Sequence, residues 1–371
     1  MKEKPLKLMI PGPIQPDPAV LEAMGSPVVP HYGADWRDYY NETVATLKQI
    51  FNTLGDVFIM VGAGTTAIES CIGSALSTGE KIIVGINGFF GERMKTIAEY
   101  YGLEVVTVTS EWGKPLRSED YAEAFRQHPD AVVATAVHLE TSTSVVNPVE
   151  EIGPIVRRHG AVFIVDAVSS LGGMDYYMDE WKIDMCASAV QKCLGAPPGL
   201  APVAVGERGW EAIDRNPAKC HGFYTNLAIW REYAQKWDWH PFPVTMAVNN
   251  VIALRTSLDQ LLEEGIENRL ERYRQLAIYL RAEIRRIGLQ PFTSDAEMSP
   301  VLTAVVAPEN LSVDHLMQYL ESERRIKIAP GLGLLAGKIF RIGHMSPVQT
   351  RDDFDELVES IHIYLQRAQT N

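Results

Sequence analysis

The chain has 371 residues and a formal net charge of −13, with 46% hydrophobic and 22% charged residues. This negative charge argues against nucleic acid as a partner, because affinity for nucleic acid comes largely from counterion release at a basic surface. No stretch reaches the roughly 18 apolar residues of a membrane span, and the first apolar stretch is too short for a secretory signal. We therefore expect a cytoplasmic protein that binds neither nucleic acid nor membrane, and the length predicts two domains.

An extended arm opens the chain, since residues 11–18 are too rich in proline for a helix or a central strand. From residue 56 to residue 206, short apolar runs alternate with stretches of helical period, the pattern of strands joined by crossover helices. Several runs are too apolar to leave a face in water, as in buried, mostly parallel strands. The expected strands cover residues 57–60, 81–86, 105–108, 131–136, 162–165, 185–188 and 202–205, and the expected helices cover residues 36–51, 66–76, 88–101, 118–128 and 149–159.

The pattern changes after residue 240, where a long helical region extends from about residue 246 to residue 287 and is interrupted at Gly265. We expect it to connect two domains: a large α/β domain over residues 1–250, with a mostly parallel central sheet sandwiched by helices, and a small C-terminal α/β domain over residues 251–371. In the small domain, the expected strands cover residues 301–306, 326–328 and 339–342, and the expected helices cover residues 313–322 and 351–368.

Lys192 is the most informative residue, because it stands among small, apolar and proline residues and follows Asp166, which ends the apolar strand at 162–165. Pyridoxal 5′-phosphate requires an amine that holds its aldehyde as a Schiff base and a carboxylate that keeps its pyridine nitrogen protonated. A nucleophilic lysine must also spend time neutral, which a partly desolvated pocket favours. Lys192 and Asp166 are therefore our candidate catalytic pair, although an isolated loop lysine is more often a surface residue.

A glycine-rich turn supplies a candidate phosphate site. Residues 62–66 follow an apolar strand and open a helix, so Ala63, Gly64 and Thr65 place backbone N–H groups at a positive helix terminus. The turn lacks the lysine of a nucleotide P-loop and the GxGxxG of a dinucleotide fold, which favours a monophosphate bound without a metal. Such turns are common in α/β proteins, so this prediction depends on Lys192 and Asp166.

Two further strand ends bring candidate residues to the same sheet edge, where open α/β sheets bind ligands. Phe90 either stacks on a pyridine ring or belongs to the core, and Thr141 is our candidate for bonding the ring hydroxyl. His138 and Glu140 either orient the site or hydrogen-bond the backbone of their loop. The sequence leaves both of these choices open.

Arg341 lies inside an otherwise apolar strand of the expected small domain. A buried arginine needs an anionic partner, and its planar fork suits a carboxylate, so Arg341 either binds the α-carboxylate of an amino acid or forms an internal ion pair. The four cysteines, at 71, 186, 193 and 220, have no metal-ligand spacing, and we expect reduced thiols and no metal site.

Together these residues resemble the class V aminotransferases of fold type I, in particular the group of alanine–glyoxylate and serine–pyruvate aminotransferases. The resemblance covers nearly the whole chain, and the segments around Asp166 and Lys192 are its most specific parts. It implies a fold type I architecture, pyridoxal 5′-phosphate as cofactor and a homodimer with shared active sites. The matching segments are residues 12–13, 31–33, 62–67, 87–91, 166–173, 191–192, 197–199 and 341–343.

The resemblance also implies roles for individual residues. Lys192 would be the Schiff-base lysine and proton shuttle, and Asp166 would pair with the pyridinium nitrogen. Phe90 stands where the family usually has a stacking tryptophan. The other implied contacts are Val168 and Thr141 with the ring; Gln191, Ala63, Gly64 and Thr65 with the phosphate; Gly12 and Arg341 with the substrate; and Thr245 and Phe242, where the family has Tyr-x-x-Thr, with the phosphate in the partner subunit.

The implied activity is the transfer of an amino group from a small amino acid, such as alanine or serine, to glyoxylate or pyruvate by a ping-pong mechanism. Residues 192–200, 241–243 and 341–345 also resemble pyridoxamine–pyruvate aminotransferase, which uses the vitamer as a substrate. We favour a bound cofactor because the turn at 62–66 looks intact. A lyase or desulfurase would need a cysteine in the small domain, and none lies beyond Cys220. A non-catalytic binding protein of the same fold is the remaining alternative.

Overall fold

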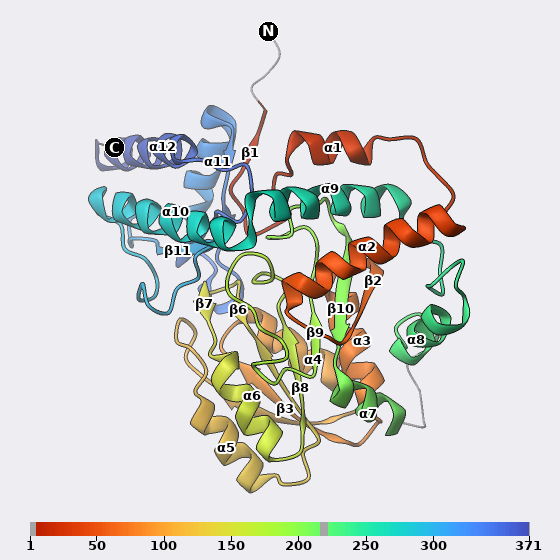
Figure 1. The fold of residues 1–371 in the computed structure, drawn as a ribbon. Helices are drawn as coiled ribbons and strands as arrows, with labels where there is room; N and C mark the ends of the chain where they lie inside the picture. Colours follow the sequence, from red (N-terminus) through yellow and green to blue (C-terminus); the bar gives the residue numbers. More distant parts are fainter. Residues whose placement is uncertain (1–4, 216–221, 371) are drawn as a thin grey trace.

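The computed structural model describes residues 5–215 and 222–370, and its centre is a seven-stranded sheet with the order β2-β10-β9-β8-β5-β3-β4 (Figure 1). Strand β10 is antiparallel to both of its neighbours, and the other strand pairs are parallel. The mostly parallel sheet that we predicted is therefore confirmed. The strands are β2 (Asp56–Gly62), β3 (Lys81–Ile86), β4 (Glu104–Thr109), β5 (Val133–Val137), β8 (Val162–Asp166), β9 (Met185–Ala187) and β10 (Gly199–Val205).

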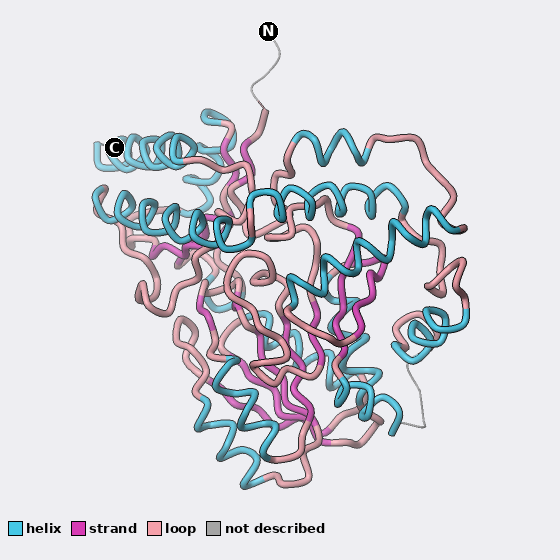
Figure 2. The backbone as a smooth tube through the Cα atoms, in the orientation of Figure 1, coloured by secondary structure: helices cyan, strands magenta, loops and turns pink. Residues whose placement is uncertain are grey.

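Helices enclose this sheet, as Figure 2 shows by the cyan coils around the magenta strands. Every residue of β5, β8 and β9 is buried, which is why these runs lack the alternation of a strand with one wet face. The helices of this part of the chain are α1 (Pro18–Met24), α2 (Ala34–Phe51), α3 (Gly64–Ala75), α4 (Phe89–Tyr100), α5 (Ser118–Gln127), α6 (Val149–Arg158), α7 (Glu207–Arg215) and α8 (Leu227–Lys236).

The C-terminal part has its own antiparallel sheet, with the order β11-β14-β13. Its helices α11 and α12 lie together near the C-terminus (Figure 1). The expected helix at 246–287 is two helices, α9 and α10, because Gly265 has a φ of +85° that interrupts the helical hydrogen bonds. The elements are α9 (Val248–Glu264), α10 (Ile266–Arg286), β11 (Leu302–Val306), α11 (Val313–Arg324), β13 (Ala329–Pro330), the 3₁₀ helix η1 (Gly333–Leu335), β14 (Ile339–Gly343) and α12 (Arg351–Thr370).

Two predictions need correction. The strand expected at 326–328 is present as β12 (Ile326–Lys327), which pairs with β1 (Lys7–Leu8) of the N-terminal segment, but a second short strand that we did not predict, β13, follows it and pairs with β14. The extended arm ends one residue earlier than expected, since Pro18 begins helix α1. Proline suits the first helical position, where its missing N–H has no intrahelical partner.

The two largest clusters of buried hydrophobic residues are a larger core around the seven-stranded sheet and a smaller core in the C-terminal part. Leu254 and Leu258 of α9 belong to the larger core around the seven-stranded sheet, whereas Leu280 and Ile284 of α10 belong to the smaller one. Helix α9 thus packs with the large sheet, and the domain boundary at residue 250 stays a prediction. In residues 5–215 and 222–370, no helix has the length and apolar character needed to cross a bilayer, and the cytoplasmic location also stays a prediction.

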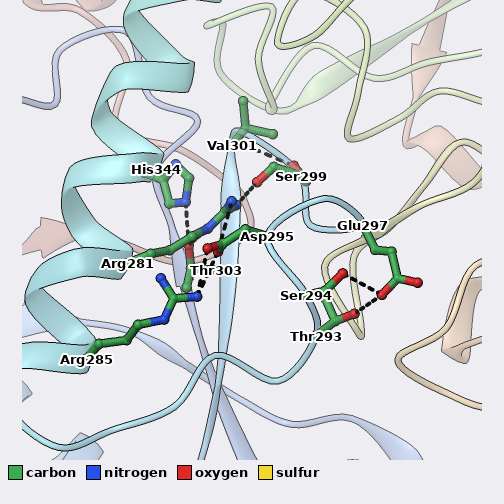
Figure 3. A network of polar contacts seen from close by, with 10 residues as sticks. All are labelled: Arg281, Arg285, Thr293, Ser294, Asp295, Glu297, Ser299, Val301, Thr303 and His344. Atoms are coloured by element: carbon green, nitrogen blue, oxygen red, sulfur yellow. Dashed lines mark hydrogen bonds and ion pairs between the residues drawn. The ribbon is translucent and has the colours of Figure 1, made fainter.

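A polar network surrounds Arg281 in the C-terminal part (Figure 3), and backbone hydrogen bonds continue it into the large part. Arg281 of α10 is buried and donates a hydrogen bond to the carbonyl of Ser299, in the segment that leads to β11. In turn, the amide of Ser299 donates to the carbonyl of Ser144 at 2.9 Å, and the amide of Val146 donates to the carbonyl of Glu297 at 2.9 Å. These bonds attach the smaller core to the loop that follows β6 (Leu139–Glu140) and to β7 (Val145–Val146).

We expect Arg281→Met to lower the free energy of unfolding by about 3 kcal/mol, because it leaves buried acceptors without their donor. Arg285→Met is the matched control: Arg285 lies on the same helix and forms a 2.9 Å ion pair with Asp295, but its side chain is 39% exposed. This variant should lose less than about 1 kcal/mol. Urea unfolding measures both, and equal losses would contradict the assigned role of Arg281.

Candidate active site

A cavity of about 370 Å³ opens at the carboxyl edge of the large sheet. It contains ten of the predicted site residues: Gly12, Ala63, Gly64, Thr65, Phe90, Thr141, Asp166, Val168, Gln191 and Lys192. An adjoining cavity shares Gly12, Phe90, Thr141 and Lys192 and adds Arg341. The sequence analysis missed several residues of the first cavity, which are Pro13, Ile68, Arg93, Val137, Leu139, Ser169 and Pro198.

Lys192 lies in the loop between β9 and β10 and is partly buried. Its Nζ donates a hydrogen bond to the carbonyl of Pro11, which brings the N-terminal arm into the site. Gly12 allows this approach, because a Cβ added there would lie 2.6 Å from Lys192 Cδ. Burial lowers the pKa of Lys192 to about 8, and the charge of Arg341 acts in the same direction. A neutral, nucleophilic amine is therefore accessible near neutral pH.

Asp166 is the last residue of β8, and its side chain is buried. Its carboxylate accepts a 2.8 Å hydrogen bond from the amide of Val168. Burial raises the pKa of Asp166 to about 6, and the nearby charge of Glu140 acts in the same direction. A buried carboxylate with this little compensation is suited to a cationic ligand group.

The N-terminus of α3 forms another wall of the cavity. Ala63 caps this helix without a side-chain hydrogen bond, so the first N–H groups face the cavity. Gly64 lies directly against Val168, where an added Cβ would be 2.6 Å from Val168 Cγ2. Within the described residues, the Oε1 atom of Gln191 is buried and has no hydrogen-bond partner. The uncapped N–H groups of α3 are donors and fit a phosphate group.

Phe90 lies in the first turn of α4 and lines both cavities. The guanidinium of Arg93, one turn further along, is 5.0 Å from the centroid of the Phe90 ring. This distance is within the range of a cation–π contact, which helps to keep the ring in one orientation. The structure thus places Phe90 at the ligand cavity rather than inside the large core.

Thr141 and Arg341 meet in the second cavity. The guanidinium donates hydrogen bonds to the carbonyls of Thr141, at 3.0 Å, and Pro330, at 2.9 Å. In β14, Arg341 lies between Ala304 of β11 and Ala329 of β13, whose small side chains leave room for it. Burial lowers the pKa of Arg341 to about 10, so it stays charged at neutral pH.

No carboxylate among the described residues lies within ion-pair distance of Arg341. This observation removes the internal ion pair as an explanation for the buried arginine. A buried cation such as Arg341, which bonds only to carbonyls, suits an external carboxylate.

The hydroxyl of Thr141 is 2.7 Å from that of Ser169, a residue that the sequence analysis did not assign to the site. Ser169 directly follows Val168 in the sequence, and this position was the signal that could have identified it.

The loop residues His138 and Glu140 have different surroundings. The His138 ring packs against Tyr176 and Trp181 and does not line either cavity. Burial lowers the pKa of His138 to about 3, so the ring stays neutral. Glu140 is fully buried and bonds to backbone N–H groups. Residues 5–215 and 222–370 contain no group of three or more His, Cys, Asp or Glu that fits a metal ion.

Phe242 and Thr245 lie outside both cavities. The Phe242 ring is fully buried in its own chain, with centroids 4.3 Å from His240 and 4.9 Å from Tyr40. A ring covered in this way has no surface left for a partner's cofactor, so the structure argues against the contact that we expected for Phe242. Thr245 is exposed just before α9, and its contact with a partner subunit stays a prediction.

The cysteines do not contribute a nucleophile in the described part of the chain. Cys71, Cys186 and Cys193 are buried free thiols. Burial raises the pKa of Cys193, the neighbour of Lys192, to about 12, which keeps it protonated. Cys220 lies outside the described residues.

The model of the class V aminotransferase family matches residues 21–344. The chain belongs to this family. The residues of the cavity fit the cofactor of the family, and the protein is a pyridoxal phosphate-dependent aminotransferase of fold type I.

Three known aminotransferases illustrate how similar this chain is to other proteins. An uncharacterized aminotransferase of Methanocaldococcus jannaschii is 40% identical, over 91% of this chain and 87% of its own. The (S)-ureidoglycine–glyoxylate transaminase of Bacillus subtilis is 35% identical, over 91% of this chain and 85% of its own. The crystal structure of an alanine–glyoxylate aminotransferase from Nostoc sp. has a TM-score of 0.94 and 30% identity, and it covers 98% of this chain and 96% of its own.

The pKa of Asp166 predicts how cofactor binding depends on pH. With a pKa of about 6, Asp166 should become protonated as the pH falls through this value. We expect its ionised form to pair with a protonated pyridine nitrogen, so affinity for pyridoxal phosphate should fall by up to roughly tenfold per pH unit below about pH 6. Titration of the cofactor-free protein measures this. Asp166→Asn should bind more weakly and lose this component, and an unchanged pH dependence would contradict the assignment.

Proposed function

We propose that this aminotransferase moves an amino group from a small amino acid of the alanine or serine type to glyoxylate or pyruvate by a ping-pong mechanism. One observation carries the proposal: Lys192, Asp166 and a buried Arg341 that lacks an acidic partner among the described residues line two adjoining cavities. The similarity to alanine–glyoxylate and ureidoglycine–glyoxylate enzymes supports glyoxylate as an acceptor.

The chain's own groups have separate tasks in this proposal. Lys192 Nζ holds the cofactor and, once released, moves a proton to and from the substrate Cα. Asp166 keeps the pyridine nitrogen protonated, and Arg341 orients the substrate through its carboxylate. When bound, pyridoxal phosphate supplies the electron sink that stabilises the charge left on Cα. The N-terminus of α3, Thr65 and Gln191 hold its phosphate.

The charges of the second cavity support substrates with one carboxylate. Its basic residues are Lys192, Lys327 and Arg341, and Lys327 forms an ion pair with Glu321. Since Lys192 is assigned to the cofactor, Arg341 is the cation that remains for a carboxylate. The apolar residues of this cavity do not favour a second acidic group on the substrate; they are Ile10, Met317, Ile328 and Leu332.

We also propose a homodimer in which Thr245 of the partner subunit completes the phosphate site. Tyr32 and Trp239 support this arrangement, because they are 55% and 52% exposed and their rings are in edge contact near the segment that carries Thr245. Exposed aromatic side chains of this kind mark interaction surfaces. A holoenzyme that sediments as a monomer would refute the proposal.

The central experiment combines spectroscopy with a donor and acceptor screen. The purified protein should show the visible absorbance of a lysine-bound cofactor and respond to alanine or serine, whereas Lys192→Ala should lose both, because Lys192 is the one lysine among the described residues that lines the first cavity. Lys95→Ala, on the exposed side of α4, is the control and should behave as the parent protein.

Three results would contradict the proposed function. An absent cofactor band in the parent protein would favour a non-catalytic binding protein. A Lys192→Ala variant with an unchanged band would remove the assigned lysine. Turnover of free pyridoxamine with pyruvate, with no cofactor retained after dialysis, would establish the vitamer as the substrate.

Arg341→Leu should raise the KM for amino and keto acids by about ten- to a hundredfold, the loss expected for a charge-assisted bond to a carboxylate, and leave the cofactor bound. Steady-state kinetics with alanine and glyoxylate measures this. Arg324→Leu, in the last turn of α11 and outside both cavities, is the control and should keep the KM of the parent protein. Unchanged KM values for Arg341→Leu would refute its role.

A further inference from the structure

Two helices begin at the cofactor cavity, and their N-termini differ. The first N–H groups of α3 have no side-chain cap from Ala63 and face the cavity. The N-cap of α4 is Gly88, which also lacks a capping side chain, but the first N–H groups of α4 are donors to side chains of another loop. They bond as follows: Phe89 N to Ser142 Oγ at 2.9 Å, and Phe90 N and Gly91 N to Glu140 Oε2 at 3.1 Å each.

Glu140 is built into this position. Its second oxygen, Oε1, accepts hydrogen bonds from the amide and the hydroxyl of Ser142, at 3.0 and 2.5 Å. Within the described residues, no cation lies within ion-pair distance of this fully buried carboxylate. A carboxylate that accepts several N–H bonds at a helix N-terminus is stabilised in its charged form, which offsets the cost of burial. Gly88 makes room for it, because a Cβ added there would lie 2.3 Å from Glu140 Cδ.

The turn of α4 that Glu140 caps carries Phe90 into the cavity, and Arg93 follows one turn further along. On the other side of Glu140, the carbonyl of Thr141 accepts the hydrogen bond from Arg341. A single buried carboxylate therefore lies between the residue proposed to stack on the cofactor and the residue proposed to bind the substrate. Because the first N–H groups of α4 already donate to Ser142 and Glu140, the N-terminus of α3 is the one left for the phosphate.

We propose that Glu140 is a positioning residue of the aminotransferase site: its buried carboxylate caps α4 and thereby holds the Phe90 ring against the cofactor. This inference rests on the proposed function, since it assigns Phe90 to the bound cofactor. Glu140 itself touches neither substrate nor cofactor in this scheme. Its effect on the reaction passes through the backbone of α4.

The first experiment needs no cofactor. Hydrogen–deuterium exchange at the Phe90 and Gly91 amides, in the cofactor-free full-length chain, should be at least about tenfold faster in Glu140→Gln, because a glutamine amide loses acceptor positions and the charge that strengthens these bonds. Glu92→Gln is the matched control, since Glu92 lies exposed in the same turn of α4. Equal exchange in Glu140→Gln and the parent protein would overturn the proposal.

The second experiment asks whether Glu140 acts through Phe90. We expect the dissociation constant of pyridoxal phosphate to rise about fivefold in Phe90→Ala, the loss of one stacked ring, and by a similar factor in Glu140→Gln. The double variant should stay within about twofold of Phe90→Ala alone. A dissociation constant that rises by the product of the two factors would show that Glu140 acts independently of Phe90, and would overturn the proposal.

A third variant covers the case in which Glu140→Gln does not fold. Ser142→Ala removes the acceptor of the Phe89 amide and keeps the carboxylate, and it should show a smaller rise in the dissociation constant with the same non-additivity. Additive behaviour would again overturn the role of Glu140. A parent protein that binds no pyridoxal phosphate would refute the proposed function instead, while the exchange experiment would still decide whether Glu140 holds α4.

Discussion

The site depends on buried charged side chains that do not form ion pairs with each other. Lys192, Asp166, Glu140 and Arg341 are all within or beside the two cavities, and no ion pair joins any two of them in the described structure. Burial moves their pKa values in the direction of the neutral forms. Each charge is instead held by hydrogen bonds to the backbone, which leaves it able to respond to a ligand.

The large sheet explains how such an arrangement is built. Parallel strands bring their carboxyl ends to one edge, so Asp166, the turn before α3 and the loop after β5 meet there although they are far apart in sequence. Strand β10 runs antiparallel and begins at that same edge, which is how the Lys192 loop enters the site. The buried strands on either side fix the positions of these strand ends. The charged side chains that they carry are therefore kept apart and do not pair with each other.

The smaller part of the chain contributes Arg341, the cation that we propose binds the substrate. Arg341 lies in β14. The N-terminal segment contacts the Lys192 side chain through the carbonyl of Pro11 and pairs with strand β12 through Lys7–Leu8. The network around Arg281 (Figure 3) is joined to the loop just beyond Glu140 and Thr141 by backbone hydrogen bonds of Ser299 and Glu297. The position of Arg341 relative to Lys192 and Asp166 is therefore set by contacts between the two cores, and not by either core alone.

The sequence by itself determined the family and predicted the lysine, its partner acid and the strand ends that carry the site, because strand periodicity, glycine turns and the residues next to them are local signals. It left open whether Arg341 was paired and whether Glu140 was structural, and it assigned Phe242 to a contact in the partner subunit that the burial of its ring argues against. Only the tertiary structure decided these points. Each depends on which side chains approach from distant segments: the alanines beside Arg341, the α4 amides around Glu140, and the rings that bury Phe242.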